Sequence, residues 1–332
     1  MRGAHPLRLL LPVLLITIPA VAGVAHLAPA LGPHAWRSAD FLVSLFVLVL
    51  LLVPFSLLSL ETVVDRLRRF VDGRPITSLV LAATLICPYA LYWSVPGKAD
   101  LTALCGVVAY VGAVSGAAVL LPRGSRRSLA DLGVVLAIWL PVEFRWLDRS
   151  FPWPPKGSGR ILCGLLALNL LLYLLVVVRR VEGIGYSFAL RRGDLPRVLG
   201  AFCAFAAAGI PIGFATGFLE VRSGWPGLPD VGEKLVLIFL FTGVPEETLF
   251  RGCIQGILER WTARPTVSLL LASVVFGLAH LDNGPVPDWR YAVLAALAGV
   301  AYGWVFQKTR RIVAPALTHT LVDATWKLVL SR

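Results

Sequence analysis

Apolar runs close to the length of a membrane-spanning helix recur along the chain, and they restrict its fold more than any other feature of the sequence. A hydrocarbon core of roughly 30 Å is crossed by about 20 helical residues, whose backbone polar groups are satisfied within the helix. Hydrophobic residues make up 57% of the chain and charged residues only 15%, which does not fit a soluble protein. The sequence therefore predicts an all-α fold, a polytopic transmembrane helical bundle with the lipid bilayer as its surroundings.

We expect about eleven spans. They cover residues 9–27, 41–60, 76–95, 101–121, 129–144, 161–178, 198–219, 235–254, 267–281, 291–306 and 312–330. The first resembles a signal peptide, with small residues near Ala28. We expect it to be retained as a span, because its removal would invert the distribution of charge described next.

The net charge of +12 would suggest a nucleic-acid partner in a soluble chain, but here basic residues gather in short breaks between apolar runs, as in cytoplasmic loops. The breaks on one side of the predicted bundle contain Arg66, Arg68, Arg69, Arg74, Arg123, Arg126, Arg127, Arg179, Arg180, Arg191, Arg192, Arg197, Arg260, Arg264, Lys308, Arg310 and Arg311. The opposite breaks are poorer in basic residues, except around residues 150–160. We predict a cytoplasmic N-terminus, an outside C-terminus and no nucleic-acid partner. The excess of arginine over lysine and the lack of an N-x-S/T sequon favour a bacterial plasma membrane.

A proline-rich piece, residues 151–159 (FPWPPKGSG), is too rich in turn formers to continue a helix. It predicts a boundary near residue 155, with residues 1–155 as an N-terminal transmembrane scaffold region. Residues 156–194 would form a connecting span and a cytoplasmic loop. Residues 195–332 would form a more acidic C-terminal core that holds the unusual polar residues.

The sequence TGVPEETLFR, residues 242–251, places three charged groups inside an apolar span. Each costs roughly 2.5–3.5 kcal/mol at membrane depth on insertion scales, so all three require partners. Glu247 and Arg251 are four residues apart and can form an ion pair on one helix face, which a purely structural salt bridge would also explain. Glu246 points about 100° away and is left unexplained by that pair. Pro245 removes a backbone donor, which favours a kink and a wet pocket.

Two later spans supply histidines with complementary chemistry. His280 follows Phe276 by four residues in FGLAH, and His319 precedes Asp323 by four residues in HTLVD. A histidine inside a membrane can be a packed core residue or a catalyst. Because both histidines accompany the glutamates, we expect them to meet in one mid-membrane pocket.

The ordered motifs EExxxR, FxxxH about thirty residues later and HxxxD in a late span resemble the CAAX-processing and bacteriocin-processing (CPBP, or Abi) intramembrane protease family, which includes type II CAAX prenyl endopeptidases. The resemblance covers about residues 195–330. It implies that Glu246 and His280 polarise a water molecule that attacks a peptide bond, while His319 and Asp323 face the oxyanion. Glu247 and Arg251 would organise the site. The partner would be a membrane-associated peptide or protein substrate, and no cofactor is favoured.

The commoner family pattern has asparagine where this chain has Asp323, and an ionised aspartate cannot donate a hydrogen bond to an oxyanion. Asp323 could be protonated, could orient His319, or could bind a metal. A zinc-dependent protease would use Glu246, His280, His319 and Asp323 as ligands, although HExxH is absent. A transporter or proton-coupled carrier is the alternative from another class, because buried Glu, His and Arg also mark ion pathways. It would be favoured by inverted repeats, which are not visible.

Overall fold

The computed structural model describes residues 6–26, 38–95, 100–122, 129–148, 150, 159–221, 224, 227–283 and 286–331. Over these residues the protein is all-α apart from one pair of two-residue strands. The chain divides into two compact units, Met1–Glu182 and Gly183–Arg332. The boundary predicted near residue 155 lies outside the described residues.

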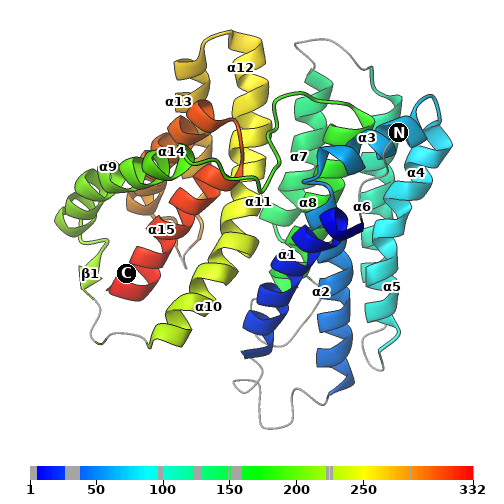
Figure 1. The fold of residues 1–332 in the computed structure, drawn as a ribbon, viewed down its shortest axis with the longest axis horizontal. Helices are drawn as coiled ribbons and strands as arrows, with labels where there is room; N and C mark the ends of the chain where they lie inside the picture. The colour runs from blue at the N-terminus through cyan, green and yellow to red at the C-terminus, as the bar shows by residue number, and fades with distance from the viewer. Residues whose placement is uncertain are drawn as a thin grey trace. The chain divides into compact units, whose positions relative to one another are not determined.

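The first unit contains α-helices that follow one another along the chain (Figure 1). They are α1 (Pro6–His26), α2 (Ala39–Leu57), α3 (Glu61–Val71), α4 (Pro75–Ala83), a 3-10 turn (Thr84–Ile86), α5 (Cys87–Trp93), α6 (Leu101–Leu120), α7 (Leu129–Glu143) and α8 (Gly159–Leu172), which continues as a π-helical segment (Tyr173–Val178). Buried polar side chains fix these helices to one another, since in lipid an unsatisfied polar group is costly. Asn169 donates to the carbonyl of Leu51 (2.9 Å), and Arg179 pairs with Asp131 (2.5 Å).

The second unit contains α9 (Asp194–Ala215), β1 (Glu220–Val221), α10 (Leu228–Ile238), α11 (Val244–Glu247), α12 (Gly256–Thr262), α13 (Pro265–Ala279), α14 (Trp289–Thr309), α15 (Val313–Val329) and β2 (Leu330–Ser331). Helices α10, α11 and α12 form one continuous helical column in Figure 1, because π-helical segments Phe239–Gly243 and Thr248–Gln255 join them. Strands β1 and β2 pair antiparallel, so the end of α15 is tied to the segment after α9.

Among the described residues, six helices are long and apolar enough to cross a membrane, which identifies an integral membrane protein. They span Ala39–Leu57, Pro75–Trp93, Leu101–Leu120, Ile161–Val178, Asp194–Ala215 and Trp289–Thr309. The prediction of about eleven spans is thus met in part. The other predicted segments also fall on helices, but α7 and α13 have 15 residues each and α15 has 17. Helix α3 was not predicted, because the charged residues of its sequence ETVVDRLRRFV are typical of a loop between spans.

Small residues bring the helices of the second unit close together, as is usual between helices in membranes. A Cβ atom on Gly277 of α13 would lie 2.4 Å from the carbonyl oxygen of Ala292 in α14. A Cβ atom on Gly299 of α14 would lie 3.2 Å from Ser273 of α13. The two backbones therefore meet along a glycine seam, which fixes the position of the residues that follow Gly277.

Charged pairs close the turn between α14 and α15. Arg310 has a left-handed backbone (φ 54°) and binds both carboxylate oxygens of Glu259 at 2.6 Å. Its hydrogen bonds to Glu259 raise the pKa of the Arg310 guanidinium above its ordinary value. Arg311 binds both oxygens of Asp194 at 2.7 and 2.6 Å. These contacts anchor α12 and α9 to the start of the helix that carries His319.

Candidate active site

The helical column changes its winding where it carries the charged residues. Pro245 has no backbone N–H, and π-helical segments lie on both sides of α11. π-Helical turns inside helices occur frequently at functional sites. Glu246 and Glu247 end the short α11, and Arg251 lies in the next π-helical segment. Where a kink was predicted at Pro245, the structure has π-helical segments, which widen the helix locally.

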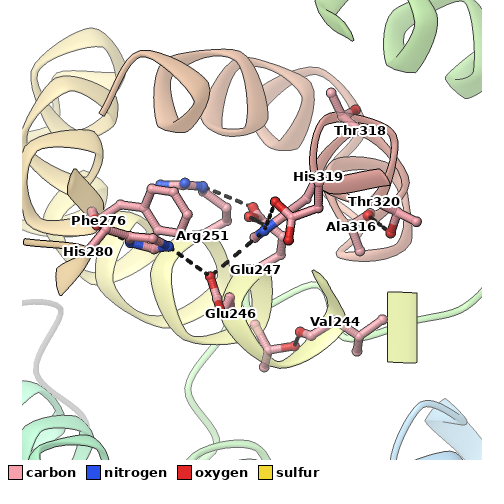
Figure 2. Close-up of polar contacts among 12 residues, drawn as sticks. Val244, Glu246, Glu247, Arg251, Phe276, His280, Ala316, Thr318, His319 and Thr320 are labelled. Atoms are coloured by element: carbon pink, nitrogen blue, oxygen red, sulfur yellow. Dashed lines mark hydrogen bonds and ion pairs between the residues drawn. The ribbon is translucent and has the colours of Figure 1, made fainter. Parts of the chain in front are cut away.

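A chain of three polar side chains, Arg251, Glu247 and His319, is buried in the second unit. Arg251 donates from Nε to Oε2 of Glu247 over 3.0 Å, and both side chains are fully buried. The other oxygen of Glu247, Oε1, lies 2.9 Å from Nδ1 of His319. A carboxylate paired with arginine only accepts hydrogen bonds, so Nδ1 of His319 is the donor. The Nε2 atom of His319 is thereby turned towards Glu246 (Figure 2). It also lies near Asp323.

Aromatic rings enclose this chain. Tyr302 stacks on His319 with ring centroids 4.7 Å apart and an angle of 12° between the planes. The guanidinium of Arg251 lies over the ring of Phe276, 4.8 Å from its centroid. Phe276 also lies 4.5 Å from the ring of His280. Because buried rings restrict one another's rotation, this packing holds both imidazoles in fixed orientations.

Glu246 faces the two histidines rather than the arginine. Its Oε2 atom lies 3.8 Å from Nε2 of His280 and 3.9 Å from Nε2 of His319 (Figure 2). Among the described residues this buried oxygen has no hydrogen-bond partner, although 30% of the side chain is exposed. Nδ1 of His280 donates to the carbonyl of Phe276 over 2.8 Å, so a neutral His280 presents an unprotonated Nε2. The two imidazoles and Glu246 therefore surround a position that a water molecule can reach.

Asp323 completes the group from α15. Its Oδ1 atom lies 3.6 Å from Nε2 of His319, and its Oδ2 atom lies 3.2 Å from Nζ of Lys327. All six residues predicted from the sequence are thus brought together, from α11, the π-helical segment after it, the C-cap of α13 and α15. Two neighbours were missed. Tyr302 has no motif spacing that would single it out, whereas Lys327 follows Asp323 by four residues and could have been found on that basis.

A cavity adjoins the histidines. It measures about 70 Å³, several times the room that one water molecule needs. Its lining includes His280, His319 and Asp323, and the rest of the lining is mostly apolar, with Phe205 and Gly209 of α9 among it. Both histidines and Asp323 therefore border a mostly apolar space, as is usual in ligand-binding pockets.

Metal ligation was the alternative use of these side chains. Within the described ranges, no three or more His, Cys, Asp or Glu side chains converge in a way that could hold a metal ion. The shortest imidazole–carboxylate contact among the four candidate ligands is the 3.6 Å separation of His319 and Asp323.

Fold and site together define an integral membrane protein with a buried carboxylate–imidazole centre beside an apolar cavity. Residues 233–325 match the model of the family described as type II CAAX prenyl endopeptidase Rce1-like. This segment is a domain of that family, which confirms the resemblance found in the sequence, and it contains all six site residues. The match implies a peptidase that acts on a protein substrate. No curated protein and no solved structure matches the chain.

Proposed function

We propose that the protein is an intramembrane endopeptidase that hydrolyses a peptide bond of a membrane-associated peptide or protein. The observation that supports this function best is the position of Glu246. Its carboxylate oxygen lies within 4 Å of the Nε2 atoms of both His280 and His319, with no arginine or lysine paired to it among the described residues. A partly desolvated carboxylate next to imidazoles is a competent general base.

In this proposal Glu246 and His280 bind the attacking water between them. The water oxygen forms a bond to the carbonyl carbon of the scissile amide while its proton passes to Glu246. The tetrahedral intermediate then collapses, the carbon–nitrogen bond breaks, and the proton moves on to the leaving amine. His280 is suited to assist both transfers, because its Nδ1 is fixed by the carbonyl of Phe276 and only its Nε2 faces the reaction.

His319 and Asp323 would stabilise the opposite side of the reacting carbonyl. When Nε2 of His319 carries a proton, it can donate to the developing oxyanion, and the hydrogen bond from Nδ1 to Glu247 stabilises the resulting imidazolium. Arg251 compensates the charge of Glu247, since the two side chains are fully buried and directly bonded. Glu247 and Arg251 therefore organise the site without contacting the substrate.

The proposal includes the membrane topology predicted from the sequence. If the shorter apolar helices also cross the membrane, the number of spans is about eleven, with the N-terminus in the cytoplasm and the C-terminus outside. The bilayer, by this proposal a bacterial plasma membrane, would present the substrate, and no nucleic acid or cofactor would be needed. A zinc-dependent form would use Glu246, His280, His319 and Asp323 as ligands, so the experiment below includes a chelator.

The test is cleavage of a library of membrane-associated peptides by purified protein in liposomes, with products identified by mass spectrometry. Wild-type protein should cut at defined bonds, with or without chelator. The Glu246→Gln variant, prepared in the same way, should leave the library intact. Equal cleavage by both proteins would reject the proposal, and so would the absence of cleavage across a library that includes prenylated C-termini and unmodified transmembrane segments.

A further inference from the structure

Three carboxylates lie within 4 Å of the single imidazole of His319. Glu247 is 2.9 Å from Nδ1, while Asp323 and Glu246 are 3.6 and 3.9 Å from Nε2. Like charges this close repel one another strongly in a site with little water. Such a site needs permanent positive charges nearby, and we expect each cation to pair with one particular carboxylate.

The structure assigns a cation to two of the three carboxylates. Arg251 binds Glu247 at 3.0 Å, and Lys327 lies 3.2 Å from Asp323. Glu246 has neither arginine nor lysine against it in the described part of the chain. Of the three carboxylates, Glu246 is thus the one not bound to a lysine or arginine in the described part of the chain. A general base needs an oxygen that is free in this way to accept a proton.

The need for a cation at Asp323 follows from the identity of that residue. An asparagine at this position would add no charge and would donate a hydrogen bond from its amide, whereas an aspartate adds a negative charge and donates nothing when ionised. The chain that carries Asp323 also carries Lys327 one helical turn later on α15. The two oxygens of Asp323 are divided between Lys327 and His319.

We infer that Lys327 is a positioning residue for hydrolysis: by binding Oδ2 of Asp323 it holds Oδ1 towards His319 and offsets the negative charge that Asp323 adds beside the oxyanion position. The inference rests on the proposed peptidase function. Lys327 acts through Asp323, and its own contact with the substrate is not required.

An ordinary structural reading of the same pair makes a different prediction. Lysine is favoured in the last turn of a helix, and Asp323 and Lys327 have the favourable order for a pair four residues apart. The side chain of Lys327 is 46% exposed, so such a pair would contribute little to stability. On that reading, removal of Lys327 would leave kcat unchanged whether residue 323 is charged or neutral.

The experiment compares kcat and KM of Lys327→Met in two backgrounds, wild type and Asp323→Asn. In the wild-type background we expect kcat to fall about tenfold with KM changed less than about twofold. In the Asp323→Asn background, where no charge needs an offset, the same substitution should change kcat by less than about twofold. Lys327→Arg should keep kcat within about threefold of wild type, because it restores the cation.

Lys308→Met is the matched control, since Lys308 is an exposed lysine in the last turn of α14. It should leave kcat unchanged. Thermal unfolding of each variant separates loss of folded protein from loss of turnover, and Lys327→Gln replaces Lys327→Met if the latter folds poorly. An unchanged kcat in Lys327→Met, or an equal loss in both backgrounds, would overturn the inference. The proposed function would still stand in that case if Glu246→Gln is inactive, so the two failures are distinguishable.

Discussion

Glu247 contacts Nδ1 of His319 at 2.9 Å, while the adjacent Glu246 contacts the other nitrogen of the same ring at 3.9 Å. Successive helical residues point about 100° apart, so one dipeptide can reach both sides of an imidazole packed against the helix. The side chain of Glu247 is fully buried and bound to Arg251, whereas the side chain of Glu246 is 30% exposed. Two chemically identical neighbours therefore have environments that suit different roles.

The first prediction separates these roles with a matched pair of substitutions. Glu246→Gln should abolish peptide hydrolysis and leave folding intact, because it removes the base and keeps the shape of a partly exposed side chain. Glu247→Gln should reduce both activity and stability, since it leaves Arg251 as an uncompensated buried charge. Activity and thermal unfolding of both variants in the same detergent provide the check. Substantial hydrolysis by Glu246→Gln would remove Glu246 from catalysis.

The second prediction concerns the buried arginine. Arg251→Ala should lower the amount of folded protein in the membrane, because it strands the charge of Glu247 at a cost on the order of 3–5 kcal/mol. It also removes a cation from the face of Phe276. Quantitative immunoblotting of membranes measures the effect, with Arg192→Ala, a change at an exposed arginine, as control. If Arg251→Ala accumulates to normal levels but is inactive, the arginine takes part directly in catalysis.

The third prediction tests the glycine seam beneath His280. Gly277→Ala should lower stability by roughly 1–3 kcal/mol, because the new methyl group would lie 2.4 Å from the backbone oxygen of Ala292 and must push α13 away from α14. Activity should fall as well, since His280 follows three residues later. Gly200→Ala in α9 has open space around the added methyl group and should be neutral. Equal unfolding temperatures for the two variants would show that the helices are not in close contact at Gly277.

The sequence predicted the positions of the helices and the convergence of the six site residues, because both depend on local patterns. A long run of apolar residues predicts a membrane helix, and a charged group at membrane depth requires a partner. It did not predict which apolar runs are long enough to cross a bilayer as continuous helices. That depends on where each helix ends, as for the 15-residue α13, which stops at Ala279 just before His280.

Other features missed by the sequence depend on tertiary packing. The π-helical turns after Glu247 arise where the column packs against its neighbours, and no residue type marks them in advance. Tyr302 stacks on His319 from another helix, so only the fold brings the two rings together. The amphipathic helix α3 is charged enough to read as a loop, but Arg68 on it donates to the carbonyl of Val176 and is fixed there. Long-range contacts of this kind override local propensity.

The last prediction uses Asp323 to distinguish a metal-free mechanism from a metal-dependent one. In the metal-free mechanism Asp323→Asn supplies an amide of nearly the same volume, which can donate a hydrogen bond towards the oxyanion. Activity should then be retained within about threefold or should rise, and a chelator should have no effect on either protein.

If Asp323 is instead a zinc ligand together with Glu246, His280 and His319, the same substitution exchanges a charged oxygen donor for a neutral one. Metal affinity should then fall, and the variant should lose activity and recover part of it when zinc is added. Rates for wild type and Asp323→Asn, each measured with chelator, with added zinc and with neither, separate the two mechanisms. A chelator-sensitive wild type combined with an inactive, zinc-rescued Asp323→Asn would contradict the metal-free mechanism. The position of Asp323 between His319 and Lys327 makes the opposite result the expected one, since both of its oxygens already face nitrogen groups of the chain.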